Sequence, residues 1–151
     1  MTKILLDTNI LVYAYDPADI DKQIHAIWVL NHINICENGY ISVQSLSEFI
    51  HAVTRYHKGD PARLSLEEAL EQVKLMTNSF TIFNLTPRII LEAERGVRDH
   101  HLAYYDAQIW ATARLNQTSV VFSEDFPDHL TLDGVTFINP FLPQFNIEDW
   151  T

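Results

Sequence analysis

The stretch Lys3-Ile4-Leu5-Leu6-Asp7-Thr8-Asn9 decides the predicted fold. Its three consecutive aliphatic residues are typical of a strand that is buried on both faces, as in a parallel sheet. Asp7 and the two polar residues after it then form the turn at the carboxyl end of that strand, and this edge of an α/β sheet is where ligands bind. Asp7 or Thr8 could instead only cap the following helix, so this stretch by itself leaves two interpretations open.

Length and composition predict an ordinary globular protein. We expect residues 1–151 to form a single domain, and 47% hydrophobic residues with 4 glycines and 6 prolines argue against disorder. We expect neither a signal peptide nor a membrane span, because the apolar run after Lys3 is short and no apolar stretch reaches roughly 20 residues. The single cysteine, Cys36, excludes an internal disulfide and fits a reducing compartment, so we expect a cytoplasmic protein.

The formal net charge of −10 argues against broad, non-specific binding of nucleic acid through a basic surface. It does not exclude a nuclease, because a site built from carboxylates contributes several of these charges and takes divalent cations in compensation. The same charge also leaves room for a basic partner protein.

Segments with strand and helix patterns alternate along the chain. We expect strands at residues 4–6, 39–43, 80–85, 119–123 and 135–138, helices at 10–15, 19–35, 45–56, 87–99 and 104–115, a further helix from residue 65, and a loop at 124–134. The start of the helix at Ser65 is indicated by the capping-box sequence Ser65-Leu66-Glu67-Glu68. This order predicts an α/β fold, a three-layer α/β/α sandwich around a mainly parallel sheet of roughly five strands.

Four acids occupy positions that a structural role does not readily explain. Asp7 and Asp125 follow predicted strands, whereas Glu48 and Asp106 lie near the starts of predicted helices. Asp106 belongs to a helix that is apolar nearly all round, and a charge in such surroundings costs several kcal/mol unless it is compensated. These ends of strands and helices meet at the same edge of a parallel sheet, so we expect the four carboxylates to converge.

Each acid also has a simpler interpretation. Glu48 lies away from the apolar stripe of its helix and could be solvated, and Asp106 could be a helix cap. After the fourth strand, Glu124 and Asp128 compete with Asp125 for the place of the fourth acid.

Converging carboxylates repel one another unless they are protonated or neutralised by a cation. A hard divalent ion with oxygen ligands is the natural solution, and Mg²⁺ keeps most of its waters in such a site. Such an ion can activate a bound water and stabilise the charge on a phosphodiester. The acids together therefore predict metal-dependent hydrolysis of phosphoryl esters.

Five pieces of the sequence carry a family resemblance through their order and spacing. They are Leu5-Leu6-Asp7-Thr8-Asn9, Ser47-Glu48-Phe49, Tyr104-Tyr105-Asp106-Ala107, Val121-Phe122-Ser123-Glu124-Asp125-Phe126 and Gly134-Val135-Thr136-Phe137-Ile138-Asn139-Pro140-Phe141. With these pieces the chain resembles the PIN-domain proteins, specifically the VapC-type ribonuclease toxins of bacterial and archaeal toxin–antitoxin pairs. One departure is Pro127-Asp128-His129, where family members often continue with a Gly-containing loop; it leaves the choice between Asp125 and Asp128 open.

The resemblance implies both an activity and a set of site residues. The residues that it implies for catalysis and for binding Mg²⁺ or Mn²⁺ are Asp7, Glu48, Asp106 and Asp125. Asn9 and Ser123 would be polar companions that orient a ligand or a water, and Thr8 would either join them or only cap a helix. The implied activity is endonucleolytic cleavage of RNA, and the implied partners are an RNA substrate, a second copy in a homodimer and a small cognate antitoxin.

Several basic residues could contact the RNA substrate. Arg88, Arg95 and Arg98 share one face of a predicted helix, and with Arg55 and Lys58 they could contact RNA phosphates; pairing with nearby glutamates is the alternative.

The competing function is a PIN-fold protein that binds nucleic acid or acts as a scaffold without cleavage, but a scaffold would not need all four acids.

Overall fold

The computed structural model describes residues 1–56 and 59–151, so Lys58, one of the suggested RNA contacts, lies outside the described residues. In the described part of the chain, six strands form one sheet in the order β3-β2-β1-β4-β6-β5. The parallel strands are β1 (Ile4–Leu6), β2 (Gly39–Ser42), β3 (Thr81–Phe83), β4 (Val120–Phe122) and β6 (Val135–Ile138). The short β5 (Thr131–Leu132) pairs antiparallel with β6 at the edge.

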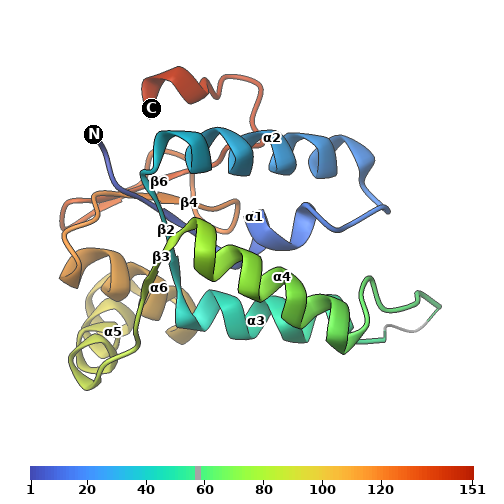
Figure 1. Ribbon diagram of the computed structural model, residues 1–151. Coiled ribbons are helices and arrows are strands. Elements are labelled where there is room, and N and C mark those ends of the chain that lie inside the picture. The colour runs from blue at the N-terminus through green and yellow to red at the C-terminus, as the bar shows by residue number, and fades with distance from the viewer. Residues whose placement is uncertain (57–58) are drawn as a thin grey trace.

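Helices cover both faces of this sheet (Figure 1). One face carries α1 (Thr8–Tyr13), α2 (Ile20–Cys36), α3 (Val43–Thr54), α4 (Leu66–Ser79) and the 3₁₀ helix η1 (Ile147–Asp149). The other face carries α5 (Pro87–His100) and α6 (Tyr104–Leu115), which pack side by side. The structure thus confirms the three-layer α/β/α sandwich predicted from the sequence.

The central strand β1 is buried on both faces, as its aliphatic run predicts. Ile4 and Leu6 belong to the core beneath α1–α4, whereas Leu5 belongs to the core beneath α5 and α6, and each is 0% exposed. Its neighbours are β2 on one side and β4 on the other. Because strand order reverses at β1, the carboxyl ends of β1 and β4 form the switch point at which open α/β sheets bind ligands.

The bounds of the expected elements agree with the structure to within about two residues, and two of the differences have a clear physical cause. Within the stretch expected to be a loop, Thr131 and Leu132 form β5, so the sheet has a strand more than expected. Asp133 and Gly134 both have positive φ, the conformation of a tight hairpin turn, and they join β5 to β6. The first helix begins at Thr8 rather than residue 10, because the Asp7 side chain caps it.

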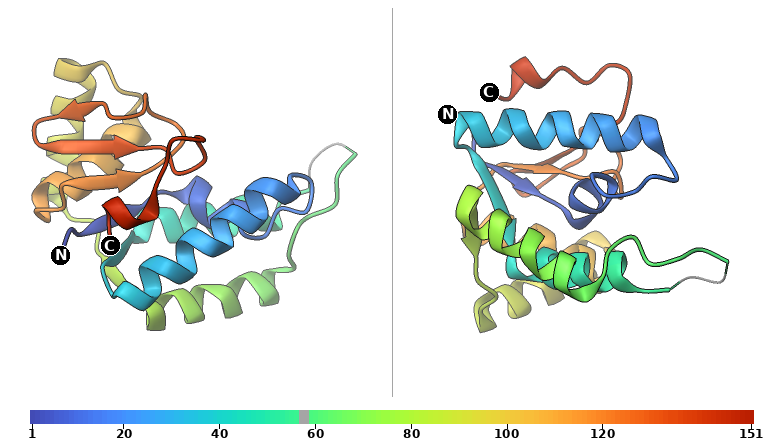
Figure 2. Two further views of the ribbon diagram at one scale, coloured as in Figure 1. Left: turned by 90° about the horizontal axis from the view of Figure 1, so that it is seen from above. Right: turned by 45° about the vertical axis from the view of Figure 1, so that its right-hand side comes forward.

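The C-terminal segment packs against the domain beside α2 and close to the N-terminus, as both views of Figure 2 show. The Asn38 side-chain amide donates hydrogen bonds to the carbonyl oxygens of Thr2 (2.9 Å) and Trp150 (3.0 Å) and so joins the two ends of the chain. Across residues 1–56 and 59–151, no helix is long and apolar enough to cross a membrane.

Candidate active site

Asp7 stands at the carboxyl end of β1 and is 4% exposed. One carboxylate oxygen accepts a hydrogen bond from the backbone N–H of Thr8 (2.8 Å), which makes Asp7 the N-cap of α1. The other oxygen accepts from the Ser123 hydroxyl (2.7 Å) at the end of β4. Asp7 therefore performs the capping role considered for it and also sits at the switch point of the sheet.

Ser123 connects Asp7 to the loop that follows β4. Its hydroxyl accepts hydrogen bonds from the Asn9 side chain (3.2 Å) and from the backbone N–H of Asp125 (3.1 Å). The same Asn9 amide donates to a carboxylate oxygen of Asp125 (3.1 Å). Asn9 and Ser123 thus fix the carboxyl groups of Asp7 and Asp125 relative to each other.

Glu48 reaches the site from α3 and is held by two donors. The Thr8 hydroxyl donates to one carboxylate oxygen (2.7 Å), and the side-chain amide of Gln44 donates to the other (2.8 Å). Glu48 is partly buried, so it does not lie on a freely solvated helix face. Thr8 orients an acid rather than capping a helix.

Asp106 lies in the first turn of α6 and is partly buried. The N-cap of α6 is Ala103, and no side chain caps this helix, so Asp106 does not serve as its cap. The side-chain amide of Gln44 donates both to Glu48 (2.8 Å) and to the backbone carbonyl of Tyr105 (3.1 Å), the residue before Asp106. The start of α6, which carries Asp106, therefore lies beside the start of α3, which carries Glu48.

Two of the four acids, Asp7 and Asp106, have a raised pKa. Burial raises the pKa of Asp7 to about 7; the hydrogen bonds from Ser123 and Thr8 oppose this rise, and the charges of Asp125 and Glu48 add to it. The pKa of Asp106 is also raised, first by burial and then by the charges of Asp125 and Glu48. Buried carboxylates with strongly perturbed pKa values in one place are typical of a functional site.

The two competitors of Asp125 have other partners. Glu124 accepts hydrogen bonds from the Tyr13 hydroxyl (2.6 Å) and from the Lys22 ammonium group (2.8 Å). Asp128 accepts from the backbone N–H of Asn139 (2.8 Å) and contacts His129, which fixes its own loop. By geometry, Asp125 is the acid of this loop that joins the other three.

An open cleft of about 330 Å³ adjoins the acids. Its lining residues are Thr8, Asn9, Val12, Tyr13, Asp16, Glu48, Arg63, Glu124 and Asp125. Arg63 pairs with Asp16 (3.1 Å), and Lys22 stands next to the cleft on Glu124. Neither cation is recognisable from the sequence, because Lys22 lies on α2 and Arg63 in the segment before α4, both far from any motif.

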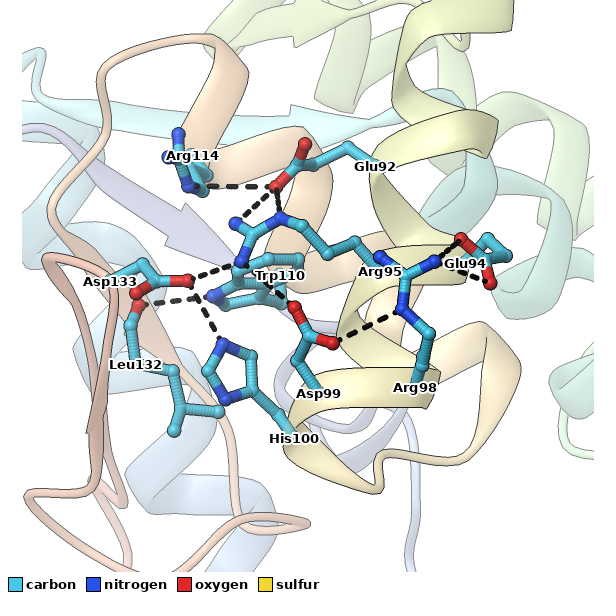
Figure 3. Close-up of polar contacts among 10 residues, drawn as sticks. All are labelled: Glu92, Glu94, Arg95, Arg98, Asp99, His100, Trp110, Arg114, Leu132 and Asp133. Atoms are coloured by element: carbon cyan, nitrogen blue, oxygen red, sulfur yellow. Dashed lines mark hydrogen bonds and ion pairs between the residues drawn. The ribbon is translucent and has the colours of Figure 1, made fainter.

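The arginines suggested to contact RNA lie elsewhere. Arg55 and Arg88 are exposed, on the C-cap of α3 and in the first turn of α5. Arg95 contacts Glu92, Asp133 (2.9 Å) and the Trp110 ring, and Arg98 pairs with Glu94 (3.2 Å) and Asp99 (Figure 3). The pairing with nearby glutamates that was the alternative interpretation is therefore present for Arg95 and Arg98.

The four carboxylates suit a divalent cation by donor type, although they do not already form a closed set of ligands. Among the described residues, no three His, Cys, Asp or Glu side chains already surround a common point. The oxygens of Asp7, Glu48 and Asp125 instead accept protein hydrogen bonds. The donor type nevertheless fits Mg²⁺ or Mn²⁺, because all four groups are hard oxygen donors. A cation would also favour the ionised forms of Asp7 and Asp106, whose pKa is raised first by burial and then by the charges of Asp125 and Glu48.

Solved structures share this fold over most of the chain. A toxin–antitoxin complex from Klebsiella pneumoniae is 20% identical with a TM-score of 0.65, and the match covers 92% of this chain and 98% of that one. The DNA-bound VapBC from Salmonella typhimurium is 17% identical with a TM-score of 0.64, covering 91% and 97%. VapC20 from Mycobacterium tuberculosis, described as a sarcin-ricin loop cleaving toxin, is 14% identical with a TM-score of 0.63, covering 82% and 90%.

A comparison with curated protein sequences finds no match. The family model described as PIN domain matches residues 4–126, which include β1 with Asp7, Glu48 on α3, Asp106 on α6 and the end of β4 with Asp125. This match covers most of the 151 residues. The chain belongs to the PIN domain family.

Proposed function

We propose that this protein is an endoribonuclease that depends on Mg²⁺ or Mn²⁺ and acts as the toxin of a type II toxin–antitoxin pair. The observation that carries the proposal is a network of hydrogen bonds at the carboxyl edge of the sheet. It links Asp7 to Asp125 through Ser123 and Asn9, and Glu48 to Thr8 and, through Gln44, to the residue before Asp106. Family membership and the fold shared with VapBC structures support the same activity.

The four acids are proposed to hold the cation. When bound there, such a cation would supply positive charge for the phosphodiester and would lower the pKa of an attacking water. Ser123 and Asn9 keep Asp7 and Asp125 at a fixed separation, and Thr8 with Gln44 fixes the carboxylate of Glu48. Because these acceptors are oriented before the substrate arrives, little reorganisation is required when the reaction begins.

An RNA strand that enters an acidic cleft needs cations to hold its phosphates. Arg63 lines the cleft and Lys22 stands at its rim, so we propose that these two residues contact phosphates next to the cleaved bond. The contacts suggested for Arg55, Arg88, Arg95 and Arg98 stay predictions and concern the more distant course of the RNA.

The biological setting is proposed from the same comparisons. We propose a small cognate antitoxin as partner, a homodimer as the assembly and the cytoplasm as the location, with residues 1–151 acting as one nuclease domain. The relatives whose structures are described as toxin–antitoxin complexes support the antitoxin, and β6 beyond the matched segment completes the same sheet.

A cleavage assay tests the proposal. The purified chain is incubated with defined transfer, ribosomal and messenger RNAs in Mg²⁺ or Mn²⁺, in excess chelator, and after the metal is restored, beside Asp7→Asn. We expect endonucleolytic products that chelation abolishes and metal restores, and none from the variant. Binding of RNA without cleavage under every metal condition would favour the scaffold interpretation, and cleavage that survives both chelation and Asp7→Asn would overturn the mechanism.

A further inference from the structure

A pair of buried amides lies beside the acids. Gln44, in the first turn of α3, is 9% exposed, and Gln108, on α6, is 5% exposed. The Gln108 side-chain amide donates to the side-chain oxygen of Gln44 (2.8 Å). Both residues lie within four positions of a proposed metal ligand, Gln44 before Glu48 and Gln108 after Asp106.

Gln44 contacts the elements that carry two of the four acids. Its side-chain nitrogen donates to the carboxylate of Glu48 (2.8 Å) and to the backbone carbonyl of Tyr105 (3.1 Å), the residue immediately before Asp106. The two helices pack on opposite faces of the sheet, α3 with α1 and α6 with α5. One side chain therefore joins both outer layers at the edge where the acids meet.

We infer that Gln44 is a positioning residue that sets the orientation of Glu48 and its separation from Asp106, with Gln108 fixing the amide of Gln44. This inference rests on the proposed function. The orientation follows from the bonding: Gln108 occupies the Gln44 oxygen, so the nitrogen of Gln44 must face Glu48 and Tyr105. A reversed amide would place an oxygen against the carboxylate and the carbonyl.

The burial of this pair argues that it serves the site rather than the fold. A pair of buried amides gains little net stability, and replacing both by apolar side chains of similar shape is often neutral or stabilising. Residues that hold metal-ligating groups behave differently, because their loss typically lowers metal affinity or activity by about 10- to 100-fold. Removal of the pair should therefore lower activity much more than it lowers stability.

The test compares Gln44→Met, the double variant Gln44→Met with Gln108→Met, and the control Gln72→Met. Gln72 accepts a hydrogen bond from the Tyr15 hydroxyl (2.6 Å), outside the acid cluster. For each protein, kcat, KM for RNA, the Mg²⁺ concentration for half-maximal cleavage and the melting temperature are measured. The single variant also loses stability, because it leaves the buried amide of Gln108 without its acceptor.

For the double variant we expect kcat to fall about 10- to 100-fold and the required Mg²⁺ concentration to rise several-fold. KM for RNA should stay within about twofold, and the melting temperature should be higher than that of Gln44→Met, because the double variant leaves no buried Gln108 amide without its acceptor. Gln72→Met should keep the wild-type kcat and Mg²⁺ dependence. A double variant with wild-type kcat and Mg²⁺ dependence, or one whose activity falls only in step with its stability, would overturn the inference. A wild type without cleavage would overturn the proposed function and this inference with it.

Discussion

Asp7 combines a structural contact with a buried charge. It caps α1 through the backbone N–H of Thr8, and its second oxygen accepts from Ser123, yet the group is almost fully removed from water. Asp7 therefore caps α1, as one interpretation of the opening stretch expects, and lies after β1 at the carboxyl edge of the sheet, where the other places it; its role as a metal ligand stays a proposal. Burial is the main cause of the raised pKa of Asp7, and the charges of Asp125 and Glu48 add to it.

The raised pKa of Asp7 predicts how stability depends on pH. The folded-state pKa is about 7 and the ordinary value is 3.8, so the folded protein holds this proton more tightly than the unfolded chain. The resulting stabilisation is fully present below about pH 4 and is lost as the pH rises through about 7. Without metal, Asp7→Asn should lack this loss and should become more stable than the wild type by a few kcal/mol at pH 8.

Urea unfolding of both proteins at pH 5 and pH 8, in excess chelator, measures this difference. The gap in the free energy of unfolding should be larger at pH 8 than at pH 5. Saturating Mg²⁺ should then stabilise the wild type at pH 8 more than Asp7→Asn, because the ion binds the folded carboxylates. An identical pH dependence in the two proteins would show that Asp7 ionises normally.

Arg63 and Lys22 predict where the RNA phosphates lie. Arg63→Gln and Lys22→Gln should each raise KM for RNA several-fold and reduce the salt dependence of binding, with a smaller effect on kcat. Arg98→Gln serves as the comparison, because Arg98 pairs with Glu94 and Asp99 on its own helix. A larger rise in KM for Arg98→Gln than for Arg63→Gln would assign the phosphate contacts to α5 instead.

For single residues, the sequence predicts those that stand out from the local pattern of strands and helices. Asp7 ends a buried strand and Asp106 interrupts an apolar helix, so both can be recognised without coordinates, and the structure places them together. Gln44 precedes Glu48 by four positions, a spacing that allows a contact on a helix, but its bond to Gln108 on α6 depends on tertiary packing. The place of Arg63 beside the cleft likewise depends on tertiary packing, through its ion pair with Asp16.

Among the elements, α5 is attached to the sheet edge by a cluster of polar contacts around Arg95 (Figure 3). The guanidinium group lies 5.0 Å from the centre of the Trp110 ring and pairs with Asp133 in the β5–β6 turn (2.9 Å). The Trp110 ring N–H donates to the carbonyl of Leu132 (3.0 Å), which joins α6 to the same turn. These contacts hold the hairpin against α5 and α6.

Arg95→Met should therefore destabilise the protein by about 1–2 kcal/mol, since it removes the contacts with Trp110 and Asp133 at a side chain that is 28% exposed. Arg98→Met is the matched control on the same helix; its ion pairs are exposed, and the change should stay within about 0.5 kcal/mol. Urea unfolding measures both. Equal changes in the free energy of unfolding for the two substitutions would show that the contacts of Arg95 with Trp110 and Asp133 do not stabilise the fold.

The order of the helices and of the five parallel strands was predictable from the sequence, whereas the β5–β6 hairpin was not. Strand β5 has only two residues and is the edge strand of the sheet, so no alternation of apolar residues marks it. The Asp133-Gly134 pair is a recognised turn signal, but only contacts with β6 turn it into a strand pair. Gly96 on α5 is similar: a Cβ there would lie 2.9 Å from the Trp110 ring, a close helix contact that the sequence does not reveal.

For the whole molecule, topology explains how residues from distant segments share one site. β1 lies between β2 and β4, α1 and α3 follow β1 and β2 directly, and α6 begins beside Gln44 of α3. The short strands leave these starts of helices at one edge, where four carboxylates gather in a protein with a net charge of −10. The fold class follows from the sequence, whereas the hydrogen bonds that orient the acids follow only from the packing.

Whether the four acids form one metal site is tested by single-turnover cleavage of one RNA substrate in Mg²⁺. The wild type is compared with four single variants: Asp7→Asn, Glu48→Gln, Asp106→Asn and Asp125→Asn. The four acids are proposed to act as one metal site, so each substitution should lower the cleavage rate by at least about 100-fold. The double variant of Asp7 and Asp106 should be little slower than either single variant, because residues that act as a unit are not additive. Wild-type cleavage rates in two or more of the single variants, with all proteins folded, would contradict the account.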